Sequence, residues 1–238
     1  MRLRRTARAS FATVFLAVGG CGAGEDAPPP PQGRVVLAGT RSSDPAIGSI
    51  QAYIDRNAQS RRPDRSSADW RLSTPMRPSV TFSPSATYVW TLETDAGSIQ
   101  IRLRTGEAPE HAANAIYLSL LGFYDGLAIH TIMPGRALET GDPADDGKGS
   151  PGYAFSPETR AARHDRRGLV SAVSLGDSTD DSKFRITFGA DASILPLSTI
   201  FGDVERGLEV LKKLEELGTP SGKPKSRVTI RRAIVSLR

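Results

Sequence analysis

The sequence is poor in the residues that most often cross-link chains or catalyse reactions. Among its 238 residues it has one cysteine, Cys21, and three histidines, His111, His130 and His164. A single cysteine excludes an internal disulfide. The histidines are widely spaced, and no Ser-His-Asp set, metal-ligand spacing or glycine-rich phosphate loop accompanies them. We therefore expect neither a metal nor a cofactor.

The chain also lacks a strong charge excess once its first residues are set aside. The formal net charge is +5, but residues 1–20 hold four arginines and no acid, so residues 21–238 carry only +1. A nucleic-acid partner would require a basic surface on the folded part of the chain. We therefore expect no nucleic-acid partner.

Residues 1–20 have the features of a signal peptide. Four arginines precede an apolar run over residues 9–18, which is too short to span a bilayer. The run ends at Val18-Gly19-Gly20-Cys21, which resembles the lipobox of bacterial lipoproteins. The resemblance implies a lipid on Cys21 and a protein of the cell envelope that faces the periplasm, and Gly22 favours the outer membrane. The alternative is a soluble secreted protein with a chance cysteine.

A tether and a short extension follow the signal peptide. Four consecutive prolines, Pro28 to Pro31, stay extended, so we assign residues 21–40 to a tether. Residues 41–87 form an extension with one predicted helix near 45–58. Asp44-Pro45 is a typical helix start, and Ile47, Ile50 and Ile54 share one helical face.

From residue 88 onward the pattern favours a mainly β domain. Alternating apolar residues on either side of Asp95-Ala96-Gly97-Ser98 predict a β-hairpin, and short strands separated by glycine and proline follow. Two helices are predicted, over 109–121 and 208–217, and the chain ends in a strand within 228–237. Two helices among many strands indicate a β-barrel capped by helices.

Several short motifs follow one another in a characteristic order. They are Gly122-Phe123-Tyr124-Asp125-Gly126-Leu127, Ile129-His130, Pro134-Gly135, Gly141-Asp142-Pro143, Pro151-Gly152-Tyr153, His164-Asp165-Arg166 with Gly168, Phe184 with Ile186-Thr187, and Thr199-Ile200-Phe201-Gly202. Over residues 88–238 they resemble the cyclophilin-type peptidyl-prolyl cis-trans isomerase family. The resemblance implies an eight-stranded antiparallel barrel capped by two helices.

The resemblance also implies a reaction and the residues that perform it. The family isomerises the bond before proline, whose barrier of about 18–20 kcal/mol reflects amide resonance. A family arginine donates a hydrogen bond to the prolyl nitrogen in the twisted state. Thr131 stands at that position, after Ile129-His130. A short neutral side chain cannot replace a guanidinium, so we assign no catalytic residue.

Most other positions of the family's peptide groove differ as well. The positions that the resemblance assigns to the groove are His130, Thr131, Arg136, Ala137, Glu139, Val173, Ser174, Lys183, Arg185, Ile194 and Ser198. Only His130 is retained, and Ile194 is changed conservatively. Glu139 and Lys183 replace two glutamines and form a predicted opposite pair. With Arg136 and Arg185, the groove would hold one acid and three bases.

These changes lead to two hypotheses about function. The first is an exported, membrane-anchored cyclophilin-type protein that binds polypeptide segments or a protein partner, with isomerase catalysis weak or lost. Its groove would bind an acidic segment or be closed by its own ion pairs, with residues 41–75 laid across it. The alternative is an active isomerase that assists the folding of exported proteins, with Arg136 or Arg185 supplying the missing cation. The charged residues could also be solvent-exposed with no joint role.

Two clusters of aspartates leave a calcium site open as a further alternative. They are Asp142, Asp145 and Asp146, and Asp177, Asp180 and Asp181. Aspartates in glycine-rich loops can bind calcium. The simpler interpretation, which we adopt, is that they are solvated turn residues.

Overall fold

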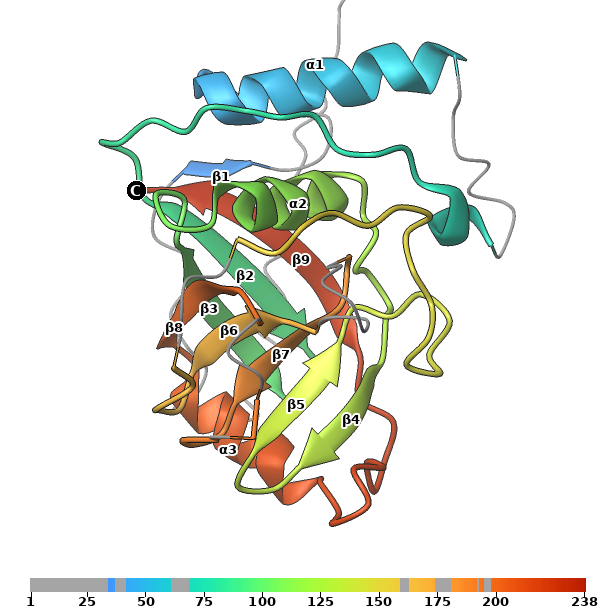
Figure 1. Ribbon diagram of the computed structural model, residues 1–238, viewed down its shortest axis with the longest axis vertical. Coiled ribbons are helices and arrows are strands. Elements are labelled where there is room, and N and C mark those ends of the chain that lie inside the picture. The colour runs from blue at the N-terminus through green and yellow to red at the C-terminus, as the bar shows by residue number, and fades with distance from the viewer. Residues whose placement is uncertain are drawn as a thin grey trace, which may run out of the picture.

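The structure is a computed structural model that describes residues 34–36, 42–60, 69–158, 163–173, 181–191, 193–194 and 198–238 (Figure 1). Its helices are α1 (Pro45–Ser60), α2 (Pro109–Leu120) and α3 (Leu208–Glu216), with a 3₁₀ turn over Trp70–Ser73. Its strands are β1 (Arg34–Val36), β2 (Tyr88–Thr94), β3 (Gly97–Leu103), β4 (Ile129–Met133), β5 (Ala137–Thr140), β6 (Leu169–Ala172), β7 (Phe184–Thr187), β8 (Ile200–Arg206) and β9 (Ile230–Leu237).

The strands form one curled antiparallel sheet in the order β1-β9-β2-β3-β8-β6-β7-β5-β4. The segment around the start of β4 bonds to the segment around the start of β9, because Ile129 N donates to Val228 O and Ile230 N donates to Leu127 O, both at 2.9 Å. These bonds join the two ends of the eight strands β2 to β9. The predicted eight-stranded antiparallel barrel is therefore confirmed.

The two helices predicted for the barrel lie at its opposite ends (Figure 1). On α2, ten consecutive residues from His111 to Leu120 are buried, and Ser119 Oγ accepts a 2.8 Å hydrogen bond from the core indole of Trp90. On α3, the apolar side chains of Val210, Leu211 and Leu214 are buried while charged residues face outward. The core between the helices is a single apolar cluster centred on the strands.

The extension begins with the helix that the sequence predicts. Asp44 caps α1, because its Oδ1 accepts a 2.9 Å hydrogen bond from Ile47 N, as expected of an N-cap residue. Ile47 and Ile50 are fully buried, and Ile54 packs against the core. The predicted helix start and apolar face are therefore confirmed.

Residues 69–87 continue across the α2 side of the barrel as a strap. The Arg71 guanidinium donates to the carbonyls of Phe123 and Asp125, each at 2.7 Å. Arg77 is buried, pairs with Glu110 and stacks on Phe155. In Figure 1, α1 and this strap lie beyond α2, at the end of the barrel opposite α3. The described part of the extension thus docks on α2.

The strand β1 falls within the range that the sequence assigns to the tether. Its residues pair with the edge of β9, Arg34 opposite Leu237 and Val36 opposite Val235. The signal peptide, Cys21 and the proline run lie outside the described residues. Within the described part of the chain, none of the helices is both long and apolar enough to cross a membrane.

Candidate functional site

Four adjacent strands bring one polar side chain each into a single row. Thr131 on β4 is the cross-strand neighbour of Glu139 on β5, which neighbours Arg185 on β7, which neighbours Ser171 on β6. Successive side chains of a strand point to opposite faces, so the adjacent apolar residues of these strands enter the core. We call Thr131, Glu139, Arg185 and Ser171 the polar row. Three of its members are predicted groove residues.

An ion pair occupies the middle of the polar row. Arg185 Nη2 lies 3.1 Å from Glu139 Oε1, and the two side chains are only 15% and 21% exposed. The pair was not anticipated, because the sequence predicts Glu139 to face Lys183. The antiparallel register of β5 and β7 decides the partner, since it places Glu139 directly opposite Arg185.

Lys183 is turned away from the predicted groove into the protein. Its Nζ donates to Gly149 O at 2.6 Å and lies 3.0 Å from Asp181 Oδ2, and both side chains of the pair are at most 1% exposed. Burial raises the pKa of Asp181 above its usual value although Lys183 opposes the shift. The predicted Glu139–Lys183 pair is therefore wrong, and Lys183 ties β7 to the loop at Gly149.

Arg136 forms the third ion pair, at the rim of the site. Its Nε donates to Asp191 Oδ2 at 2.9 Å, and its Nη2 donates to Ser193 Oγ. Burial alone would raise the pKa of Asp191, but hydrogen bonds from Ser193 and Arg136 outweigh it and lower the pKa to about 2. Asp191 is therefore a carboxylate at neutral pH.

The predicted excess of positive charge is absent from the described residues. The three bases Arg136, Lys183 and Arg185 each have an acidic partner, in Asp191, Asp181 and Glu139 respectively. Both arginines offered as substitutes for the missing catalytic cation are engaged in this way.

Thr131 is the end member of the polar row and lies next to the loop after α3. Ile132 N donates to Gly222 O at 2.8 Å, which holds this loop along the edge of β4 that does not pair with β5. Gly222 has φ +83°, and a Cβ at this position would lie 3.2 Å from Thr131 Cγ2. The side chain at position 131 is thus neutral and lies close to the loop at Gly222.

His164 lies close enough to Arg185 of the polar row to feel its charge, and the sequence assigned it only to the scaffold. It is 6% exposed, and neither ring nitrogen has a hydrogen-bond partner among the described residues. Burial lowers its pKa, and the nearby charge of Arg185 lowers it further, with Asp191 and Asp165 opposing. Because the pKa lies below the usual 6.5, the imidazole is neutral at pH 7. The only sequence signal for this residue is its place in the motif before Gly168.

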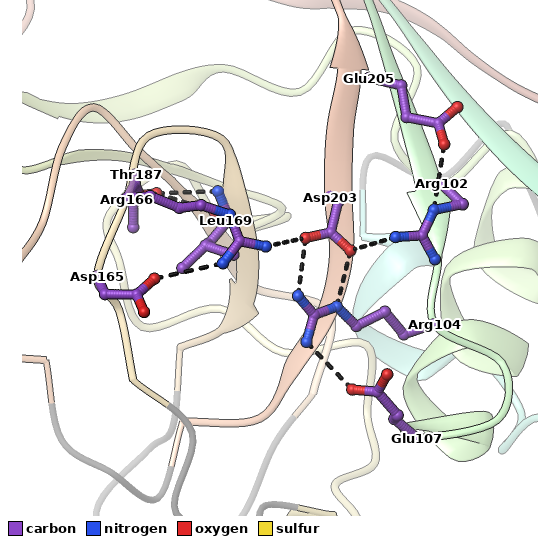
Figure 2. Close-up of polar contacts among 9 residues, drawn as sticks. All are labelled: Arg102, Arg104, Glu107, Asp165, Arg166, Leu169, Thr187, Asp203 and Glu205. Atoms are coloured by element: carbon purple, nitrogen blue, oxygen red, sulfur yellow. Dashed lines mark hydrogen bonds and ion pairs between the residues drawn. The ribbon is translucent and has the colours of Figure 1, made fainter.

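A second ion-pair cluster anchors the segment that carries His164. Figure 2 shows Asp203 surrounded by Arg102, Arg104 and Arg166, and Arg166 Nη2 donates to Asp203 Oδ1 at 2.7 Å. The Arg166 carbonyl in turn accepts a 2.7 Å hydrogen bond from Thr187 Oγ1 at the end of β7. These contacts fix the segment relative to β7, and so relative to Arg185.

The remaining predicted groove residues are mostly buried. Ala137 is buried between Met133 and Thr187, Ile194 and Ser198 are buried, and Val173 N donates to Lys183 O at 3.1 Å. His130 adjoins Thr131, and its buried Nδ1 has no hydrogen-bond partner in the described part of the chain. Ser174 lies outside the described residues.

The aspartate clusters match the expected solvated turns only in part, because Asp145 and Asp146 are exposed turn residues whereas Asp142 and Asp181 are buried. Asp142 is 1% exposed, and its carboxylate accepts hydrogen bonds from the backbone N–H groups of Ala144, Asp146 and Gly147. Asp177 and Asp180 lie outside the described residues. Within the described ranges, no group of three histidines, cysteines or acids is placed to hold a metal ion. Asp142 therefore shapes its own loop.

Comparison with known proteins agrees with this architecture. The family model described as cyclophilin type peptidyl-prolyl cis-trans isomerase/CLD matches residues 89–235. Peptidyl-prolyl cis-trans isomerase CYP18-1 of Arabidopsis thaliana is 34% identical over 150 residues, which cover 61% of this chain and 94% of the relative. Peptidyl-prolyl cis-trans isomerase-like 3 of Gallus gallus is 37% identical over 131 residues, which cover 53% of this chain and 81% of the relative.

A solved structure agrees as well. The crystal structure of a Cryptosporidium parvum cyclophilin type peptidyl-prolyl cis-trans isomerase is similar with a TM-score of 0.59 and 28% identity, covering 64% of this chain and 98% of that chain. The family model matches more than half of the residues, and the barrel has the strands and capping helices that the resemblance implies. The chain therefore belongs to the cyclophilin-type peptidyl-prolyl cis-trans isomerase family.

Proposed function

We propose that this chain is an exported, membrane-anchored member of the family that binds polypeptide segments or a protein partner, with isomerase catalysis weak or lost. The observation that carries the loss of catalysis is the neutral side chain of Thr131 where the family has an arginine. The nearest substitutes do not compensate, because Arg185 is paired with Glu139 and Arg136 with Asp191.

Retention of the barrel supports a binding role. The strands, the capping helices and the loop at Asp142 are all intact, whereas most predicted groove positions have changed in character. In place of an apolar pocket, the site presents the hydrogen-bonding groups of the polar row. Such groups favour a polar polypeptide segment over a proline ring, because burying them against carbon leaves them unsatisfied.

The test of catalysis is a proline-isomerisation assay on the full chain with Xaa-Pro peptides, with the Cryptosporidium parvum relative as the positive control. Losing a donor that stabilises the transition state costs on the order of 10²–10³ in rate, so we expect turnover near the uncatalysed rate. Thr131→Arg should not restore activity, because Arg185 and Glu139 still occupy the neighbouring positions. A rate comparable to that of the control would overturn the proposal.

The second candidate is an active isomerase that assists the folding of exported proteins. It is favoured by the 34–37% identity to relatives named peptidyl-prolyl cis-trans isomerases. In this case Arg136 or Arg185 would act as the cation, so Arg136→Met or Arg185→Met would abolish the activity. An active full chain that loses its activity in either variant would support the second candidate. A full chain that is already inactive would support the first.

The proposed location has its support in the leader, the position of Cys21 and the proline run that follows it. A lipid on Cys21 would hold the barrel at a membrane surface facing the periplasm, with the outer membrane favoured by Gly22. An acidic segment stays a candidate ligand. Each base of the described site has an acidic partner, so an excess of positive charge no longer favours an acidic ligand. The preference for one ligand over another then depends on which hydrogen bonds the site can form.

A further inference from the structure

Buried polar atoms without partners are concentrated around the polar row. In the described part of the chain, eight buried side-chain nitrogen or oxygen atoms have no hydrogen-bond partner. Five of them belong to His130, His164, Ser171 and Arg185. Most buried polar atoms in proteins are hydrogen-bonded, because leaving one unpaired is destabilising. Their clustering at one site indicates that a ligand supplies the missing partners.

Three of the four residues are related to one another through Arg185, namely Arg185 itself, Ser171 and His164. Arg185 uses Nη2 for Glu139, which leaves its buried Nε–H without a partner among the described residues. Ser171 is its cross-strand neighbour and is fully buried, and the charge of Arg185 acts on the His164 ring. The Arg185 and Glu139 side chains are partly exposed, so the site is open to solvent at this pair, and a ligand would reach it there.

The unpaired atoms include both donors and acceptors. The Arg185 Nε–H is a donor only. A neutral imidazole such as that of His164 has one N–H donor and one acceptor nitrogen, and the Ser171 hydroxyl can donate or accept. A ligand that satisfies this set must itself offer at least one acceptor and one donor. A side-chain carboxamide offers two acceptor lone pairs and two N–H donors on one small planar group.

We propose that the polar row, together with His164, binds the carboxamide side chain of an asparagine or glutamine in a polypeptide segment. The carbonyl oxygen accepts from Arg185 Nε–H and from one donor of Ser171 or His164, and the NH₂ group donates to the remaining acceptor. This inference rests on the proposed function, because it names the side chain that the bound segment presents.

The other two candidate side chains fit less well. A carboxylate has acceptors only, and it would lie near the acidic side chains of Glu139 and Asp191 with nothing to donate to the acceptor nitrogen of His164. A proline ring satisfies none of the unpaired atoms and would bury them against carbon. The expected order of affinity is therefore carboxamide, then carboxylate, then proline.

The experiment is a titration of the ¹⁵N-labelled full chain with capped hexapeptides that differ at one central residue, which is Gln, Asn, Glu, Leu or Pro. Loss of a hydrogen bond to a charged donor changes affinity by roughly tenfold, so the Gln and Asn peptides should bind about tenfold more tightly than the Pro and Leu peptides. Binding should shift the backbone amides of Ser171 and Arg185 and the ring nitrogens of His164.

Two variants and one control test whether the polar row causes the preference for Gln and Asn peptides. Arg185→Leu removes the donor and should abolish the preference, whereas Arg232→Leu, at an exposed arginine on β9, should leave it unchanged. If Arg185→Leu does not fold, Ser171→Ala removes a single oxygen and should reduce the ratio of Gln to Leu affinity several-fold.

The outcomes separate the inference from the proposed function. Peptides that bind at the row with equal or higher affinity for Pro or Glu would overturn the carboxamide assignment and leave the binding function in place. If none of the peptides shifts the row resonances at millimolar concentration, both the assignment and the proposed binding of polypeptide segments fail. Preference for Gln or Asn that Arg185→Leu removes is the result that we expect.

Discussion

At the scale of the residue, Lys183 shows how burial changes the role of a charged side chain. The sequence places it in the groove, but the structure buries it with Asp181 and the carbonyl of Gly149. Two charges taken out of water stabilise a fold only when both are well paired. Lys183 is therefore part of the architecture of the site rather than a group that contacts ligand.

Lys183→Met should be strongly destabilising. Breaking a buried pair by removing one partner costs about 3–5 kcal/mol, because Asp181 is left buried without an opposite charge and keeps only the hydrogen bond from the backbone N–H of residue 183. Urea unfolding of the variant at pH 7 measures this loss. Asp181→Asn combined with Lys183→Met should recover part of it. A double variant that is less stable than the single one would contradict this account.

The same variant should become relatively more stable at lower pH. The folded-state pKa of Asp181 is already raised by burial, and removal of Lys183 raises it further. A carboxyl with a raised pKa takes up its proton more readily when folded, so the stability of the variant relative to the native chain rises as pH falls from 7 toward 4. A deficit in unfolding free energy that is constant with pH would contradict the assignment.

Asp191 should contribute stability with the opposite pH dependence. Its pKa is lowered to about 2, below the usual 3.8 of an unfolded aspartate. The stabilisation is therefore present above pH 4 and lost as pH falls from about 4 to 2. Asp191→Asn should cost about 1–2 kcal/mol at pH 7, since the partner Arg136 is half exposed, and nearly nothing at pH 2. Denaturant unfolding at several pH values measures the difference.

At the scale of the element, the extension is joined to the barrel by polar contacts as well as apolar ones. Asp44 caps α1 through Oδ1, and its Oδ2 accepts a 2.8 Å hydrogen bond from the Tyr88 hydroxyl at the start of β2. One carboxylate thus links the start of α1 to the first strand of the barrel. Asp44 therefore fixes both the start of α1 and the position in which α1 docks on the barrel.

Asp44→Ala should therefore cost more than a lost helix cap. The cap contributes about 0.5–2 kcal/mol, and the Tyr88 hydroxyl, which loses its acceptor, adds to the loss. In a Tyr88→Phe background the same substitution should cost about 1 kcal/mol less, because the hydroxyl is already gone. A double-mutant cycle by urea unfolding measures this coupling. Strict additivity of the two substitutions would show that the contact does not contribute.

At the scale of the whole molecule, the extension and the candidate site occupy different parts of the barrel. The extension lies against α2, whereas the polar row runs across β4, β5, β7 and β6. The strand β1 on β9 leaves twelve residues between Cys21 and Arg34. At full extension this stretch spans about 45 Å, so a lipid on Cys21 would keep the barrel close to the membrane surface.

Cys21→Ala should release the protein from membranes. An acyl chain contributes about 0.8 kcal/mol per buried CH₂ group, and the cysteine is the only residue in the chain that can carry it in this way. Membrane fractionation of cells that express the variant measures the release, with Ala27→Ser as the control that keeps the cysteine. Unchanged membrane association of Cys21→Ala would contradict the proposed anchor.

The sequence by itself determined the features that depend on neighbouring residues along the chain. Alternation predicted the hairpin of β2 and β3, Asp44-Pro45 predicted the start of α1, and the order of short motifs indicated the family. These signals are local, because helix caps, turns and strand periodicity act over a few residues. The same motifs also identified Thr131 as the position of the missing arginine.

Only the tertiary structure decided which charges meet and where the extension lies. Glu139 pairs with Arg185 because the register of β5 and β7 puts them opposite each other, while Lys183 turns inward to Asp181. His164 joins the site because the Asp203 cluster holds its segment against β7. Contacts between residues distant in sequence depend on strand register and on loop position. Neither can be read from the spacing of residues along the chain.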